Sequence, residues 1–380
     1  MNKKKNLTVQ NTENIKKQKE QKEKFRKEQV MTAAFLLYGI FFATGCTFNP
    51  GSVSTTSAVA SETSISTDAV EVEAEDDGSV TITEEGSYVL SGKITGTVTV
   101  DASKDAKVEI ILNGADIESE APIFIKQADK VTITLADGTT NTITQTGDFI
   151  TIDDEELNAA IYSKEDLVFD GNGSLTITSK EGHAVKSKDD LKVKAGNITI
   201  EAAKDGMHAK EELTVDGGTL KITAAEGLEA TVVTINDGDI TIEASDDGIN
   251  ASLKSDDITT AKVEINGGNL TITMGSGDTD GIDSNGDLYI NGGTITINAQ
   301  FPFDYDGTAE LNGGTVIVNG EEVTELTNQF GGGPGGGRGN MPQDFDPDNM
   351  PQGPGKGDMP EDFDPDNMPE GFDKGQRPQR

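Results

Sequence analysis

The sequence is poor in the residues that build many catalytic centres: one cysteine, two histidines and no tryptophan among 380 residues. Because Cys46 is the only cysteine, disulfides within the chain, cysteine-based zinc sites and a cysteine nucleophile in the folded part are excluded. His183 and His208 are the only histidines, and no Ser-His-Asp or Cys-His catalytic set can be recognised around them.

Large apolar side chains and positive charge are also scarce. Hydrophobic residues make up 33% of the chain and aromatic residues 5%. A globular enzyme of this length would carry more, whereas a narrow solenoid can fill its interior with stacked aliphatic residues. The 31 Lys and Arg against 67 Asp and Glu give a formal charge of -36. A phosphate backbone needs a basic face, so this balance argues against nucleic acid and favours divalent cations, or polymers bridged by them.

The N-terminal region is typical of a secretory signal. Residues 1–30 are basic and polar, and the apolar stretch at 31–42 is short for a membrane span. The following Ala43-Thr44-Gly45-Cys46 resembles a bacterial lipobox, which predicts a lipoprotein signal peptide at 1–45 and a lipid on Cys46. The alternatives are an uncleaved anchor or ordinary cleavage nearby. We expect an extracellular, monomeric protein held at the cell-surface membrane only through its lipid.

Both flanks of the central region differ from it in composition. Residues 46–78 are predicted to be a Ser/Thr-rich tether, and residues 329–380 a disordered Gly/Pro/Asp-rich tail. Within this tail, segment 344–351 recurs at 362–369. Its aspartate spacing half-matches a calcium loop, but proline lies inside it and the bidentate glutamate is missing. A solvated tail is therefore preferred over a weak calcium-binding or wall-binding element.

Residues 160–319 contain seven repeats of three apolar-polar-apolar triplets. In one repeat, Leu213-Thr214-Val215 is followed by the turn Asp216-Gly217-Gly218 and by Leu220-Lys221-Ile222. The repeats start roughly 20–30 residues apart, which is typical of solenoids. Alternation of period two predicts strands whose outer two residues face inward. We therefore predict an all-β fold, a right-handed parallel β-helix with three short strands per coil over 79–328, with an inserted loop near 144–158.

Stacked coils would align two rows of polar side chains along one face. The first row consists of acids that precede glycine, and the second of the outward residues in the third triplet. The first row is Glu181, Asp205, Glu226, Asp247 and Asp280, and the second is Lys186, His208, Glu229, Asn250, Asp283 and Asp304. Carboxylates one strand apart repel by about 3 kcal/mol at an effective dielectric constant near 20. Such rows must be solvated, paired or bridged by a cation.

Calcium fits these rows because it takes several oxygen ligands at about 2.3–2.6 Å in flexible geometry. We expect a Ca²⁺ site at Asp247, Asn250, Asp280 and Asp283, with Asp278 close by. A second, less favoured group contains Asp205, His208, Glu226 and Glu229. In the alternative interpretation, the Asp-Gly pairs only form the turns.

The repeated pattern Asp-Gly-Ile-x-Ser/Ala-x-x-Asp/Glu-Leu-x-Ile-x-Gly-Gly-Thr-Ile-Thr-Ile is carried by segments 205–222 and 280–297. With Ala160-Ile161-Tyr162-Ser163-Lys164, it resembles the carbohydrate-binding β-helix proteins of cellulolytic Gram-positive bacteria. The resemblance implies a pectate-lyase-like fold, surface location and binding of cellulose-like or acidic plant polysaccharide, with calcium on the helix ridge. The chain departs from the pattern at Glu181, Glu226 and Phe301-Pro302, which puts calcium at the ends of the rows in doubt.

Three functions follow as hypotheses. The preferred one is calcium-assisted, non-catalytic binding of plant cell-wall polysaccharide such as cellulose or polygalacturonate. Tyr162, Tyr289 and Tyr305 are expected to be exposed and are the candidate sugar-stacking residues. The first alternative is a calcium-dependent pectate-type lyase with Lys186 or Lys210 as its base. The second is a structural surface spacer or adhesin.

Overall fold

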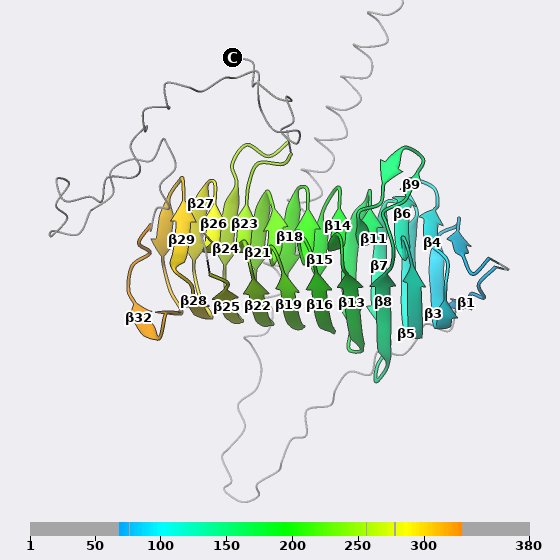
Figure 1. The fold of residues 1–380 in the computed structure, drawn as a ribbon, viewed down its shortest axis with the longest axis horizontal. Coiled ribbons are helices and arrows are strands. Elements are labelled where there is room, and N and C mark those ends of the chain that lie inside the picture. The colour runs from blue at the N-terminus through cyan, green and yellow to red at the C-terminus, as the bar shows by residue number, and fades with distance from the viewer. Residues whose placement is uncertain (1–67, 76, 256, 277–278, 329–380) are drawn as a thin grey trace, which may run out of the picture. The chain divides into compact units, whose positions relative to one another are not determined.

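Short strands that alternate buried and exposed residues wind the chain into a parallel β-helix of ten coils (Figure 1). The computed structural model describes residues 68–75, 77–255, 257–276 and 279–328, and no helix occurs within these ranges. The prediction of an all-β parallel β-helix with three strands per coil is therefore confirmed. The signal segment, Cys46 and the tail lie outside the described residues, and no helix of the described part is long and apolar enough to cross a membrane.

Three faces make up each regular coil. The first face, which we call sheet B, consists of β2 (Val80–Ile82), β4 (Val98–Asp101), β6 (Ile123–Gln127), β11 (Ala159–Ser163), β14 (His183–Ser187), β17 (Met207–Ala209), β20 (Leu228–Ala230), β23 (Asp247–Ala251), β26 (Asp280–Ser284) and β29 (Phe301–Tyr305). The second face consists of β3 (Gly86–Ile94), β5 (Lys107–Ser119), β7 (Lys130–Leu135), β12 (Asp166–Gly171), β15 (Leu191–Val193), β18 (Glu212–Val215), β21 (Val232–Ile235), β24 (Lys262–Ile265), β27 (Asp287–Ile290) and β30 (Ala309–Leu311).

The third face consists of β8 (Thr140–Gln145), β13 (Ser174–Ser179), β16 (Asn197–Ala202), β19 (Thr219–Ala224), β22 (Asp239–Ala244), β25 (Asn269–Met274), β28 (Thr294–Asn298) and β31 (Thr315–Val318). β3 and β5 are long and bend from the second face towards the third, with a register shift between Leu90 and Gly92. β1 (Val70–Glu71) pairs in parallel with β3 inside the predicted tether, and β32 (Glu321–Val323) pairs antiparallel with β31 at the last coil.

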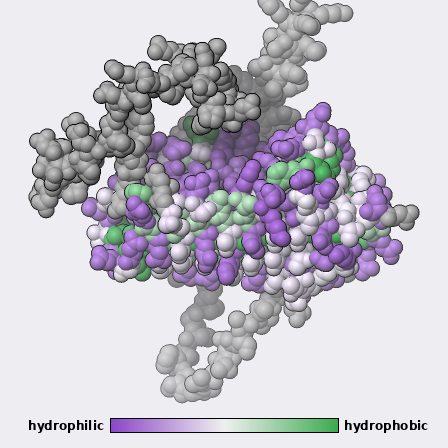
Figure 2. All heavy atoms as spheres, in the orientation of Figure 1, coloured by the Kyte–Doolittle hydropathy of each residue, from purple (hydrophilic) through white to green (hydrophobic). Residues whose placement is uncertain are grey.

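The interior consists of apolar rows that run from coil to coil. One row on the third face has every member at most 1% exposed: Ile177, Ile200, Ile222, Ile242, Ile272 and Ile297. Neighbouring strands lie about 4.8 Å apart, so each side chain packs directly on its equivalents above and below. The exposed large hydrophobic residues in the described part are Val70 and Leu253, and Figure 2 shows a mostly hydrophilic face with small apolar patches.

A three-residue corner joins the second and third faces. Gly268 occupies this corner with φ +81°, and a Cβ there would lie 2.7 Å from the Gly238 carbonyl oxygen. Glycine is required because other residues disfavour this conformation and would also clash with the coil below. Exposed asparagines stack beside it: the Asn266 amide donates to Asn236 Oδ1 (2.9 Å), and the Asn291 amide donates to Asn266 Oδ1 (2.8 Å).

The predicted insertion is a hairpin, β9 (Thr151–Ile152) and β10 (Glu155–Glu156), that covers part of the outer surface of sheet B. Leu157 packs there with Phe124 and Tyr162, and the two aromatic rings meet edge to face with centroids 6.1 Å apart. The outer surface is therefore apolar and covered over β6 and β11, and polar from β14 onward.

Candidate functional site

Sheet B carries the two predicted rows of polar side chains on its outer surface. Direct pairing aligns the outer row, which consists of Lys186, His208, Glu229, Asn250, Asp283 and Asp304, and Tyr162 and Phe124 have the same position in the two preceding coils. The corner row lies three residues earlier in each strand or turn and consists of His183, Asp205, Glu226, Asp247 and Asp280. Asp247 pairs directly with Asp280, as the register in the sequence predicts.

The prediction that Glu181 belongs to the corner row is wrong. Val185 pairs with Met207, so the position equivalent to Asp205 falls on His183. Glu181 lies two residues earlier, in the turn, where it is exposed. The Glu181-Gly182 pair resembles the Asp-Gly pairs of the other coils, but Val185 follows Gly182 by three residues, whereas its partner Met207 directly follows Gly206.

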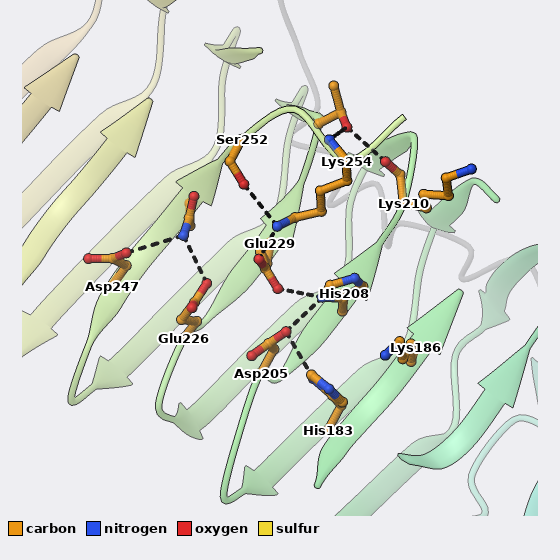
Figure 3. A network of polar contacts seen from close by, with 12 residues as sticks. His183, Lys186, Asp205, His208, Lys210, Glu226, Glu229, Asp247, Ser252 and Lys254 are labelled. Carbon is orange, nitrogen blue, oxygen red and sulfur yellow. Dashed lines mark hydrogen bonds and ion pairs between the residues drawn. The ribbon is translucent and has the colours of Figure 1, made fainter. Parts of the chain in front are cut away.

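A network of polar contacts begins at His183 and crosses three coils (Figure 3). Asp205 Oδ2 lies 2.9 Å from His183 Nδ1 and 2.7 Å from His208 Nδ1. His208 Nδ1 also contacts Glu229 Oε2. Burial by itself would raise the pKa of Asp205, but the two neighbouring imidazoles lower it below its ordinary range. Burial would lower the pKa of His208, but Asp205 and Glu229 outweigh it and raise that pKa.

Lys254 extends this network from the loop after β23. Its Nζ contacts Glu229 Oε1 and lies 2.8 Å from Ser252 Oγ. Its backbone nitrogen donates to Thr231 Oγ1 (2.9 Å), which fixes the loop over the outer surface. No repeat pattern contains Lys254 or Ser252, so the sequence offered no signal for either residue.

The acidic half of the site lies further along the rows. The Asn250 amide donates to Glu226 Oε2 (3.1 Å) and to Asp247 Oδ2 (3.3 Å). The Asp280 backbone nitrogen donates to Asp247 Oδ1 (3.3 Å). Asn250 Oδ1 is buried and accepts no hydrogen bond from the described residues.

Crowding and burial disfavour negative charge in this half. Burial, followed by the charges of Glu229, Asp205 and Asp247, raises the pKa of Glu226 to about 8. Burial raises the pKa of Asp247 to about 6, and burial together with neighbouring aspartates raises that of Asp283 to about 7. These carboxyl groups therefore share an environment that a cation would neutralise.

The other predicted site residues have different surroundings. Asp278 lies outside the described residues. Lys186 belongs to the outer row, where burial lowers its pKa and its Nζ lies 3.4 Å from Asn158 Oδ1. Lys210 lies after β17, and its side chain points away from the network (Figure 3).

The predicted exposure of the aromatic candidates is wrong for Tyr162. It is 3% exposed because the β9–β10 hairpin covers it, and its hydroxyl donates to Glu155 Oε2 (2.9 Å). Tyr305 is half-buried against the core, and its hydroxyl donates to the Leu326 carbonyl (3.0 Å). Tyr289 is half-buried on the second face and therefore belongs to a different surface.

Three groups of side chains have ligand atoms close enough to hold a metal ion. Within each group, the ligand atoms lie within 4.8 Å of one another. The groups are His183, Asp205 and His208; Asp205, Glu226 and Glu229; and Asp166, Asp189 and Asp190. The first two share Asp205 and belong to the network described above. The described residues therefore include acidic and histidine clusters suited to metal binding, although the geometry does not identify the ion.

Comparison with known proteins places this fold in a family. A family model described as "Carbohydrate-binding domain-containing protein" matches residues 76–322, which is most of the described part. The chain belongs to this family. A protein of the same description from Acetivibrio thermocellus is 39% identical over 128 residues, 32% of this chain and 45% of that protein. The match thus spans less than half of the relative's length.

A solved structure is also similar to this member of the carbohydrate-binding domain family. It is described as a polysaccharide lyase-like protein from C. thermocellum, determined as a gadolinium derivative. The two are 27% identical with a TM-score of 0.45, and the comparison covers 67% of this chain and 94% of that one.

Proposed function

We propose that the protein binds plant cell-wall polysaccharide without catalysis, with calcium held on the acidic half of sheet B. The family supports a carbohydrate ligand. The observation that carries the calcium part is the register, which stacks Asp247 on Asp280 and Asn250 on Asp283. Oxygen donors from two adjacent coils then lie side by side along sheet B, and the buried Asn250 Oδ1 supplies a further acceptor that takes no hydrogen bond from the described residues.

Calcium also explains how so acidic a protein could bind an acidic polymer. Asp283 pairs with Asp304, so carboxylates continue beyond the proposed ion site along the outer row. A uronate polymer would be repelled by this row in the absence of cations. A calcium ion with open coordination positions can bind both the row and a carboxylate of the polymer. A neutral, cellulose-like chain would not need this bridge.

The test is a pull-down of the full chain on polygalacturonate and on cellulose, with calcium and with a chelator. The double variant Asp247→Asn, Asp283→Asn removes two carboxylates from the proposed ion site. The matched control is Asp148→Asn, an exposed residue in the loop before β9. We expect calcium-dependent binding to polygalacturonate that the double variant weakens about tenfold or more, about 1.4 kcal/mol, and that the control retains. Binding that calcium and the double variant leave unchanged would exclude the calcium bridge.

One observation favours polysaccharide cleavage as the second candidate. Burial lowers the pKa of Lys186, and a lysine base needs a lowered pKa to accept a proton at neutral pH. Lys186 is therefore the better candidate base than Lys210. Ultraviolet-absorbing unsaturated products released from polygalacturonate by the native chain, and not by Lys186→Ala, would establish this activity. Lys204→Ala, which changes an exposed lysine, is the control.

We also propose that the chain is secreted and attached at the cell surface through a lipid on Cys46. The segment Ala43-Thr44-Gly45-Cys46 and the apolar stretch before it support this location. Metabolic labelling with a fatty acid, compared between the native chain and Cys46→Ser, tests it. Equal labelling of the two proteins would contradict a lipid on Cys46.

A further inference from the structure

The two histidines of this 380-residue chain meet at one aspartate. His183 lies at the start of β14 and His208 in β17, and their ring centroids are 5.3 Å apart. Asp205 lies between the rings and is 5% exposed, and His183 is 8% exposed. Glu229 of the next coil, also 8% exposed, completes the group on the far side of His208. The ligand atoms of His183, Asp205 and His208 lie within 4.8 Å of one another, and Glu229 contacts His208, so the four side chains come from three consecutive coils (Figure 3).

Hydrogen bonds do not account for the short contacts between these nitrogen and oxygen atoms. A ring nitrogen carries at most one hydrogen, yet His208 Nδ1 contacts both Asp205 Oδ2 and Glu229 Oε2. His183 Nδ1 is buried and forms no hydrogen bond with the described residues, although it lies 2.9 Å from Asp205 Oδ2. Electronegative atoms therefore face one another in a buried place with too few protons between them. An ion would resolve all three contacts at once.

The donor set selects the kind of ion. Imidazole nitrogen suits zinc, copper, nickel and iron, whereas calcium and magnesium prefer oxygen alone. Four ligands suit a tetrahedral zinc ion with bonds of about 2.0–2.2 Å, in which neighbouring ligand atoms lie about 3.3 Å apart. The His183–Asp205 and His208–Asp205 contacts of 2.9 and 2.7 Å need to open by about 0.4 and 0.6 Å, and the shorter His208–Glu229 contact by more.

We propose that His183, Asp205, His208 and Glu229 form a binding site for a divalent transition metal of the zinc class, which joins three consecutive coils. Two carboxylates balance the charge of such an ion. Glu229 can contribute Oε2, because Lys254 already occupies Oε1. Lys254 thereby positions Glu229 towards the ion. The site is independent of the calcium proposal, whose ligands lie on β23 and β26.

Cobalt is the probe for this site, because tetrahedral Co²⁺ has a strong visible absorption that distinguishes it from octahedral Co²⁺. The full chain is prepared without a histidine tag and as Cys46→Ser, which leaves no thiol and only two imidazoles. We expect one equivalent of Co²⁺ to bind with a tetrahedral spectrum, and Zn²⁺ to displace it. Mutation of a residue that only hydrogen-bonds to a metal ligand typically weakens metal binding roughly 10–100-fold. His183→Asn and His208→Asn each remove a ligand and are expected to weaken Co²⁺ binding by more than this.

The double variant Asp247→Asn, Asp283→Asn is the matched control, because it removes acidic charge from the same sheet and keeps all four proposed ligands. It retains the cobalt spectrum. Circular dichroism verifies folding, and His183→Asn provides the decisive comparison if His208→Asn does not fold. Zinc also raises the thermal midpoint of the parent protein and not that of His183→Asn. The proposal is overturned if the parent does not bind Co²⁺, if His183→Asn binds it equally well, or if equimolar Ca²⁺ displaces it.

Discussion

Replacing Asp190 by asparagine is expected to stabilise the protein at alkaline pH and to change little in acid. Asp190 precedes β15 and lies among the acidic residues Asp166, Asp189 and Glu212. Its Oδ1 accepts a hydrogen bond from the Glu212 backbone nitrogen (3.1 Å). Burial, followed by these neighbouring charges, raises the pKa of Asp190 from 3.8 to about 7.

The sign and size follow from linkage between protonation and folding. Below pH 3.8 the Asp190 carboxyl is protonated in the folded and the unfolded chain, so its ionisation takes nothing from the free energy of unfolding. As the pH rises through 7, the folded chain must give up its proton, and this stability is lost. At about 1.4 kcal/mol for each tenfold change, the loss is about 4 kcal/mol, and about 2 kcal/mol when solvent screening of the partly exposed group is allowed for.

Asparagine keeps an oxygen for the Glu212 nitrogen and carries no charge, so the Asp190→Asn variant avoids this loss. Thermal unfolding followed by circular dichroism at about pH 9 is expected to show a midpoint roughly 4–8 °C above that of the native chain. At about pH 4 the two midpoints are expected to agree closely. Asp148→Asn, the exposed control, is expected to change neither value. A lower midpoint for Asp190→Asn at about pH 9 would refute the reasoning.

Two predictions concern the frame of the solenoid. Gly268→Ala is expected to cost about 2–3 kcal/mol, because its φ is +81° and the new Cβ would lie 2.7 Å from the Gly238 oxygen. Gly92 has a φ of +70° and no atom within 4 Å of an added Cβ, so Gly92→Ala measures the cost of the backbone conformation alone, about 1 kcal/mol. Equal losses of stability in the two variants would contradict a clash at Gly268. Phe169→Ala, fully buried in β12, is expected to lose about 3–5 kcal/mol in urea unfolding. Leu253→Ala, 57% exposed, is expected to change stability by less than about 0.5 kcal/mol, and similar losses for both would contradict the assigned core.

The repeat pattern was sufficient to predict the coils and their alignment. Alternation in triplets such as Leu220-Lys221-Ile222 determines which side chains face inward, and equal spacing then stacks equivalent positions. Asp247 could therefore be placed on Asp280, and His208 beside Glu229, from the sequence. This reasoning depends only on local periodicity, which is strong in this chain.

Contacts made by segments outside the repeats could not be predicted in the same way. Tyr162 has the outward position that the pattern assigns, but a hairpin folds over it and removes it from solvent. Lys254 reaches Glu229 from a loop that has no equivalent in most coils. His183 has the corner-row position predicted for Glu181, because the Glu181-Gly182 pair lies two residues further from its strand than the Asp205-Gly206 pair does. The sequence did contain one signal for this cluster: the chain has only two histidines, and they lie in consecutive coils.

The stacked asparagines show which edge of the coil tolerates a change in length. Asn236, Asn266, Asn291 and Asn312 remain hydrogen-bonded neighbours although they are separated by 30, 25 and 21 residues. The corners that contain them always have three residues: 236–238, 266–268, 291–293 and 312–314. The extra residues instead occupy loops that flank sheet B, such as 252–261 after β23. New segments could therefore be engineered beside sheet B without altering the stacking of the coils. A single inserted residue beside the asparagines would instead shift the register between successive coils.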